Sequence, residues 1–356
     1  MVIRELVEIA VAKRASDLHL RVGSPPTLRI DGRLVAIDGL SSLKPKEVEA
    51  YFGELTTAEE RSKFSQRHEL DLQYSFPNFT RCRVNVMLQR STLSVAIRII
   101  PYDIPTIDEL NLPVILKELA LKRSGLILIT GATGSGKSST IAAMVDYLNE
   151  NEERNIITIE DPIEYVFRNK KCLIVQRNVG QDTESFDIAL LHGLRHDPDV
   201  IVVGEMRELK TMQAAIRAAE TGQLVLGTMH TSDAVQTIDR IIDIFPVNQQ
   251  EQIRSELAYI ILAVIGQILI PCSGGTGRVP ACEIMLTNNA IRNLIREGKI
   301  HQLYSQIQVG SREGMQTLNQ SLAALLNKGI IDEDQAYAST TRLDELKTLL
   351  YPPQKG

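Results

Sequence analysis

The residues whose types and spacing most clearly indicate a chemical role form the segment Gly131-Ala-Thr-Gly-Ser-Gly-Lys137-Ser138. This segment matches the pattern G-x-x-x-x-G-K-[ST]. An apolar run at 126–130 precedes the segment, and apolar residues at helical spacing follow it. Glycines let backbone N–H groups turn inward around phosphates, and the following helix N-terminus adds a positive dipole end. We therefore predict a loop that binds ATP, with Lys137 at the β- and γ-phosphates and Ser138 on Mg²⁺. The residues predicted to bind the nucleotide are Gly131, Thr133, Gly134, Ser135, Gly136, Lys137, Ser138 and Ser139.

Acidic residues follow two further apolar runs, at 155–159 and 200–203. In open α/β sheets ligands lie beyond the carboxyl ends of the strands, so both acidic groups should face the phosphate loop. Gly204 stands where an Asp usually ends the magnesium-site strand, which favours a water-mediated metal contact through Glu205. One carboxylate must orient or deprotonate the attacking water. Glu164 and Glu205 are both candidates, and spacing alone does not choose between them.

The apolar run at 224–226 is also followed by polar residues, among them His230. We expect His230 to contact the γ-phosphate and to sense its loss. Earlier in the chain, residues 82–88 and 93–99 alternate between apolar and polar side chains, which predicts an antiparallel hairpin with one apolar face. Arg81, Arg83 and Arg98 fall on the opposite, solvent-facing side of that hairpin.

The pattern of elements predicts two domains. Residues 1–100 combine helical and alternating segments, including a helical stretch at 46–66, and indicate a small α+β domain. Prolines punctuate the segment 101–113, which we interpret as a linker. From 114 to 356 short apolar runs alternate with helices, which indicates an α/β domain with a mostly parallel sheet covered on both faces. From about residue 290 the tail is expected to be helical.

Composition narrows the class of function. The net charge is −5, the pI is about 5.8 and Trp is absent, which argues against a protein that mainly binds nucleic acid. The four cysteines form no C-x-x-C pair, so a zinc site is not expected, and reduced thiols fit a cytoplasmic location. The longest apolar window, 257–270, is shorter than the roughly 20 residues of a membrane-spanning helix. We expect no transmembrane segment and no nucleic-acid partner.

Four segments in fixed order make the sequence similar to the secretion ATPase superfamily: GATGSGKSS, ITIEDPIEY, DPDVIVVGEMR and AAETGQLVLGTMHTSDAVQTIDRIIDIFP. They correspond to the Walker A, Asp box, Walker B and His box of that family. The tail AIRNLIREGK, with GMQTL after it, resembles more specifically the retraction ATPases of type IV pili, the PilT type. The resemblance covers nearly the whole chain, including the opening SDLHLRVGSPPTLRIDGRL.

The resemblance implies a homohexameric ring of subunits, each with an N-terminal PAS-like domain and a C-terminal RecA-like P-loop ATPase domain. ATP would bind between these domains, and its hydrolysis would rotate them and drive pilus retraction through an inner-membrane platform protein. Glu164 would be the general base, Glu205 the Walker B carboxylate at the metal, and His230 the second His-box histidine. The family uses arginines of the hairpin region, and we prefer Arg83 and Arg98.

One departure from the family is Gln223, which replaces the first His-box histidine and cannot carry a proton charge. Three alternatives stay open at this point. They are a pilus-extension or type II secretion assembly ATPase, a RecA-like helicase or DNA-packaging motor, and a nucleotide-gated binding protein that hardly hydrolyses ATP.

Overall fold

The computed structural model describes residues 1–13, 15–30, 32–76, 79–100, 104–274 and 277–351. The chain divides into two compact units, Met1–Asp103 and Ile104–Gly356. Residues 101–103 of the predicted linker lie outside the described residues. Ile107 and Leu112, in the same predicted linker, are buried in a core of the second unit.

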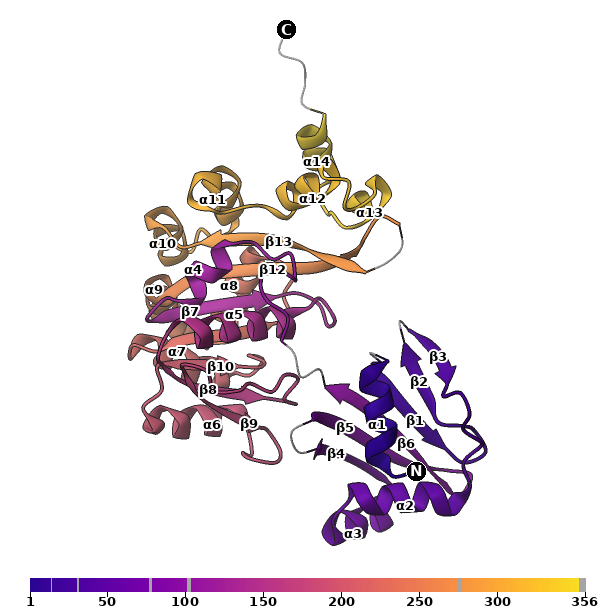
Figure 1. Cartoon of the computed structure of the whole chain (residues 1–356). Helices are drawn as coiled ribbons and strands as arrows, with labels where there is room; N and C mark the ends of the chain where they lie inside the picture. The colour runs from indigo at the N-terminus through magenta and orange to yellow at the C-terminus, as the bar shows by residue number, and fades with distance from the viewer. Residues whose placement is uncertain (14, 31, 77–78, 101–103, 275–276, 352–356) are drawn as a thin grey trace. The chain divides into compact units, whose positions relative to one another are not determined.

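The described part of the first unit has a six-stranded antiparallel sheet in the order β3-β2-β1-β6-β5-β4, shown in indigo to purple in Figure 1. Its strands are β1 (Asp17–Arg21), β2 (Thr27–Ile30), β3 (Arg33–Ala36), β4 (Glu69–Phe76), β5 (Thr80–Gln89) and β6 (Thr92–Ile100). Apolar side chains of this sheet share one core with α1 (Ile3–Ala12), α2 (Pro45–Leu55) and α3 (Ala58–Arg67).

The hairpin predicted around residues 82–99 is present as β5 and β6. Cys82, Val84 and Val86 are buried, while Arg83 between them is exposed. The single helical stretch predicted at 46–66 is instead two helices, because the chain leaves helical geometry at Thr56. The Thr57 side chain accepts the backbone N–H of Glu60, which caps α3.

The described part of the second unit has a seven-stranded sheet in the order β13-β12-β7-β11-β10-β8-β9. Every pairing is parallel except that of β13 with β12. The strands are β7 (Gly125–Thr130), β8 (Asn155–Glu160), β9 (Leu173–Asn178), β10 (Val200–Val203), β11 (Leu224–Met229), β12 (Ile261–Pro271) and β13 (Arg278–Leu286). The apolar window at 257–270 thus comprises the end of a helix and most of the largely buried strand β12.

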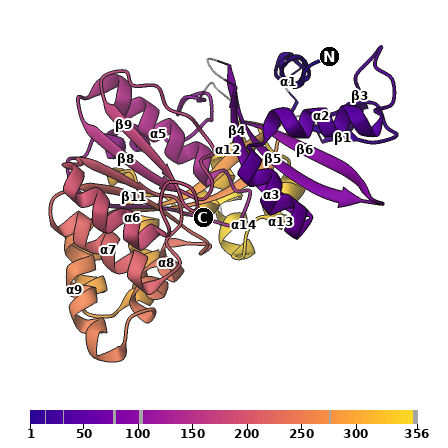
Figure 2. The same cartoon turned by 90° about the horizontal axis from the view of Figure 1, so that it is seen from below.

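Helices cover both faces of this sheet, as predicted, and Figure 2 shows α5 on one side with α6, α7 and α8 on the other. One face packs against α4 (Ile115–Ala120) and α5 (Lys137–Asn151). The other packs against α6 (Phe186–Gly193), α7 (Leu209–Glu220), α8 (Ala234–Asp243) and α9 (Gln250–Ile260). Successive residues of β10 enter opposite cores, which explains why its sequence is a continuous apolar run.

The tail is helical as predicted and lies at the β13 edge of the sheet (Figure 1). Its helices are α10 (Asn289–Arg296), α11 (Leu303–Val309), α12 (Leu318–Asn327), α13 (Glu333–Ala338) and α14 (Leu343–Leu350). In α10, Ile291 and Ile295 are buried while Arg292 and Arg296 are exposed. Within the part of the chain that the structure describes, no helix is both long enough and apolar enough to cross a membrane.

Candidate active site

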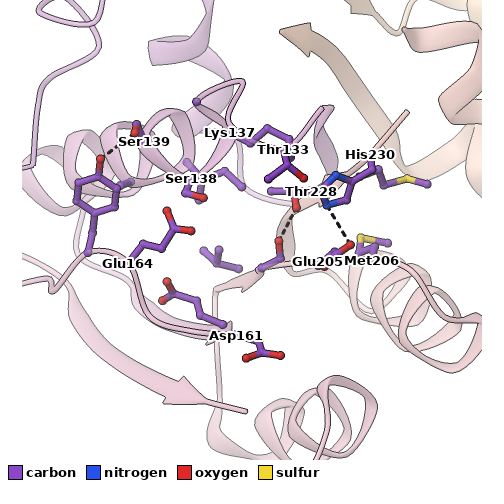
Figure 3. Close-up of a pocket in the computed structure, with 18 of the residues that line it drawn as sticks. Thr133, Lys137, Ser138, Ser139, Asp161, Glu164, Glu205, Met206, Thr228 and His230 are labelled. Carbon is purple, nitrogen blue, oxygen red and sulfur yellow. Dashed lines mark hydrogen bonds and ion pairs between the residues drawn. The ribbon is translucent and has the colours of Figure 1, made fainter. Parts of the chain in front are cut away.

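A cavity of about 930 Å³ lies beyond the carboxyl ends of β7, β8, β10 and β11, and Figure 3 shows its lining side chains. The strand order places β11, β10 and β8 successively beside β7, so segments distant in sequence converge there. The predicted site residues that line the cavity are Thr133, Gly134, Gly136, Lys137, Ser138, Ser139, Glu164, Glu205 and His230. Gly131 and Ser135 belong to the same loop but are not among the lining residues.

The phosphate loop joins β7 to α5 as the motif requires. Gly136 immediately precedes α5 and has a φ of 89°, a left-handed conformation that favours glycine. A Cβ at Gly136 would lie 2.8 Å from Nε2 of Gln267, and one at Gly131 would lie 2.3 Å from the Gln267 carbonyl oxygen. The glycines are therefore required both by backbone conformation and by close packing. Together they aim the N-terminus of α5 at the cavity, where it favours an anion.

Lys137 is the buried cation of the loop. Its Nζ donates to the carbonyl oxygens of Gly131 at 2.7 Å and Ala132 at 3.0 Å. Burial lowers the pKa of Lys137, and the charges of Glu205 and Glu164 oppose that change. The two carbonyl oxygens thus hold the ammonium at the loop, where it is suited to receive a phosphate charge.

Glu205 follows β10 and is held by two nitrogen groups. Its Oε1 lies 3.0 Å from Nε2 of His230 and 3.2 Å from Nε of Arg207. Figure 3 shows His230 reaching Glu205 from the end of β11. This contact places the predicted γ-phosphate sensor and the predicted metal carboxylate in one group.

Any side chain at Gly204, including the Asp expected at this strand end, would be tightly packed. A Cβ there would lie 3.1 Å from the carbonyl oxygen of Ile159 and 3.2 Å from the Cα of Glu160. The backbones of β8 and β10 approach each other closely at this point. An Asp at position 204 would therefore require these strands to shift by a few tenths of an ångström.

The acidic segment carrying Glu164 is held by β9, a strand that the sequence did not reveal. Asn178 accepts the backbone N–H of Ile163 at 3.1 Å, and Gln176 donates to the carbonyl of Tyr165 at 2.8 Å. The Tyr165 hydroxyl in turn lies 2.8 Å from Oγ of Ser139, at the start of α5. These contacts fix the segment against the phosphate loop, and they leave Glu164 exposed on the cavity wall.

Glu160 is a further carboxylate of the cavity wall that sequence reasoning did not select. Burial raises the pKa of Glu160, opposed by hydrogen bonds from the Thr158 hydroxyl at 2.6 Å and Gln176 Nε2 at 3.2 Å. Its position at the end of β8 was visible in the sequence, but its burial depends on β9. Arg240 of α8 and Arg278 of β13 also line the cavity without having been predicted.

The replaced His-box position, Gln223, is not among the residues that line the cavity. Gln223 immediately precedes β11, seven residues before His230, and its Oε1 accepts from the Thr221 hydroxyl at 2.8 Å. The strand thus separates Gln223 from the end that carries His230. The replaced His-box position therefore stands apart from the lining residues.

Arg83 and Arg98 belong to the first unit, where they face each other across the β5–β6 pair. Nε of Arg98 donates to Oδ1 of Asp17 at 3.0 Å, and Arg83 lies 4.0 Å from Oδ1 of Asp71. Both arginine side chains remain about half exposed or more, at 47% and 67% for Arg83 and Arg98. Their contact with a nucleotide stays a prediction.

Comparison with known proteins confirms the family resemblance. The model of the family described as type II/IV secretion system protein matches residues 1–338. The type IV pilus retractation ATPase PilT of Pseudomonas aeruginosa is 46% identical over 94% of this chain and 97% of its own. The type IV pilus ATPase PilU of the same organism is 37% identical over 98% and 91%. A crystal structure of the pilus retraction motor PilT with bound ADP has a TM-score of 0.90, with 46% identity over 98% and 99% of the two chains.

Proposed function

This chain belongs to the type II/IV secretion system protein family, and we propose that it is an ATP-hydrolysing motor that powers type IV pilus retraction. The observation that carries the proposal is the cavity at which the phosphate loop faces Glu164 and Glu205. A retraction ATPase matches this chain over nearly the full length of both proteins, which supports the same work for the whole molecule.

In this proposal the loop amides and Lys137 bind the β- and γ-phosphates of ATP. Glu164 acts as the general base. Its side chain accepts no hydrogen bond from the described residues, whereas Glu205 already has His230 and Arg207 beside one oxygen. The open oxygens of Glu164 leave room for a water molecule within hydrogen-bonding reach, which favours Glu164 for this role. Glu205 then faces the metal ion, and His230 contacts the γ-phosphate.

The hydroxyl of Ser138 and the carboxylate of Glu205 are hard oxygen donors on the same cavity, which fits Mg²⁺. Bound there, the ion would neutralise charge on the phosphates during cleavage. Ser138 follows the loop lysine at the start of α5, where the helix geometry directs its side chain toward the cavity.

We further propose that the protein works as a cytoplasmic homohexamer that acts on an inner-membrane platform protein. ATP would draw Arg83 and Arg98 toward the γ-phosphate, either within one subunit or across a subunit boundary. Hydrolysis would release them, and the two domains would rotate apart. Arginines delivered in this way contribute about 10³–10⁵ in rate to phosphoryl transfer.

ATP hydrolysis by the purified protein tests the site, with Lys137→Ala and Glu164→Gln as variants. Lys137→Ala should abolish turnover. Glu164→Gln should lower kcat by about 10²–10⁴ while ATP still binds, because it removes a general base. Turnover at the wild-type rate in either variant would refute the assigned role.

A deletion strain tests the direction of the motor. Excess surface pili with loss of twitching supports retraction, whereas absent pili would indicate a pilus-extension ATPase instead. Complementation with the Lys137→Ala variant is the matched control, since it should leave the deletion phenotype unchanged.

A further inference from the structure

Gln267 is a buried polar residue in the middle of β12, a strand that is otherwise apolar around it. Only 2% of the residue is exposed, and its neighbours Ile265 and Ile270 belong to the cores. Burying an amide is unfavourable unless its donors and acceptors are satisfied. The partners of this amide therefore indicate what the residue does.

Both partners belong to the phosphate loop and the first turn after it. Gln267 Nε2 donates to the carbonyl oxygen of Ser135 at 2.8 Å. Gln267 Oε1 accepts from the Thr140 hydroxyl at 2.8 Å, and that hydroxyl also lies 3.1 Å from the carbonyl oxygen of Gly136. One side chain thus connects the loop backbone to α5 from the strand beneath.

Residue 267 also sets how closely the loop approaches the sheet. Gly266 pairs with Thr130, so residue 267 lies directly under the point where the chain leaves β7. The loop glycines Gly131 and Gly136 approach its carbonyl oxygen and its side-chain nitrogen respectively, too closely for a Cβ. Both ends of the loop therefore rest on this one residue.

A residue needed only for the core of β12 would be satisfied by an apolar side chain, as at the positions beside it. We propose that Gln267 is a positioning residue that holds the phosphate loop in its nucleotide-binding conformation, an inference that rests on the proposed ATPase function. The ligand is a nucleoside di- or triphosphate, whose phosphates meet the loop amides from the opposite side. Gln267 itself is not among the residues that line the cavity, so it acts through the loop.

The effect on binding depends on the fraction of molecules whose loop is in the nucleotide-binding conformation. A nucleotide binds only to molecules whose loop is in the competent form, so its apparent affinity falls in proportion to that fraction. Losing the bond to Ser135 leaves a buried carbonyl without its donor and lets the loop relax toward other conformations. The effect acts on the ground state and the transition state alike, so KM should change more than kcat.

The experiment compares wild-type protein with Gln267→Met, which preserves length and removes both hydrogen bonds. We measure the Kd of ADP and of ATP by calorimetry, the KM and kcat of hydrolysis, and the thermal midpoint. Gln267→Met should raise both Kd values and KM roughly ten-fold, with kcat within about three-fold of wild type. Gln267→Glu keeps the acceptor for Thr140 and loses the donor to Ser135, so it should not restore affinity.

The matched control is Asn319→Leu in α12. Asn319 is equally buried, at 2% exposed, and its amide bonds the carbonyl of Arg342 and the hydroxyl of Thr340, neither of which lines the cavity. This control should lower the thermal midpoint without changing nucleotide affinity.

If the Gln267 variants behave like the control, Gln267 is only structural and the inference fails. If wild-type protein binds no nucleotide, the proposed function fails instead. Should Gln267→Met not fold, unchanged affinity in Gln267→Glu refutes the inference by itself.

Discussion

Glu283 provides a test of how burial controls stability beside the active site. It lies in β13 with only 4% of the residue exposed, and its Oε1 accepts the backbone N–H of Ala234 at 2.9 Å. Burial raises the pKa of Glu283 to about 7; the hydrogen bond from Ala234 and the charge of Arg342 oppose the effect, and Asp233 and Glu345 add to it. The bond to Ala234 fixes the start of α8, the helix that follows the His230 segment.

The sign of the pH dependence follows from the direction of this change. The pKa of Glu283 rises from an ordinary 4.5 to about 7 on folding, so between these values the folded protein holds a proton that the unfolded chain has released. Stability from this group is present in full below about pH 4.5 and is lost as the pH rises to about 7. The difference corresponds to about 3 kcal/mol at 1.36 kcal/mol per pKa unit.

The assay is denaturant unfolding of wild type and Glu283→Gln at pH 5 and pH 8. The glutamine keeps an oxygen acceptor for Ala234 but cannot titrate. The difference in unfolding free energy between variant and wild type should therefore move by about 2–3 kcal/mol in favour of the variant between the two pH values. Glu153→Gln, which changes an exposed carboxylate of the same unit, is the matched control. A difference that stays constant with pH would refute the reasoning.

Two further substitutions test the arginine prediction and the steric account of Gly204. Arg98→Ala should lower steady-state ATP turnover about 10³-fold, because an arginine at the transferred phosphate contributes at least that much; unchanged turnover would leave Arg98 as a structural partner of Asp17. Gly204→Asp should destabilise the protein by about 1–3 kcal/mol, because its Cβ would lie 3.1 Å from the carbonyl oxygen of Ile159. A thermal midpoint equal to that of wild type would show that the strands separate without cost.

Features carried by contiguous residues were predictable. The phosphate loop is one local segment whose conformation follows from its glycines, and the strands before each acidic group are short apolar runs with a turn after them. The parallel sheet covered on both faces follows from the alternation of those runs with helices. The division of the predicted helix at 46–66 had a local signal as well, since Thr57 and Glu60 form a capping box.

Features that depend on long-range pairing were not predictable. β9 carries polar residues at Gln176 and Asn178, and these make sense only once they bond the segment 163–167. The polar residue at position 267 looked like an interruption of an apolar window, because its partners Ser135 and Thr140 lie more than a hundred residues earlier. A single polar residue inside an otherwise apolar strand was the available signal.

The strand order explains why motifs identified one half of the site and missed the other. β7 lies between β11 and β12. On the β11 side, the neighbouring strands end in charged or polar groups that line the cavity. Such groups stand at strand ends, where the pattern of an apolar run followed by polar residues reveals them. On the β12 side, the strand continues past the loop and supports it from within the core, so its contribution comes from mid-strand. A side chain there must be buried to act, which makes it hard to distinguish from the core in sequence. The phosphate loop is therefore shaped from both sides, and only the side that lines the cavity leaves a motif.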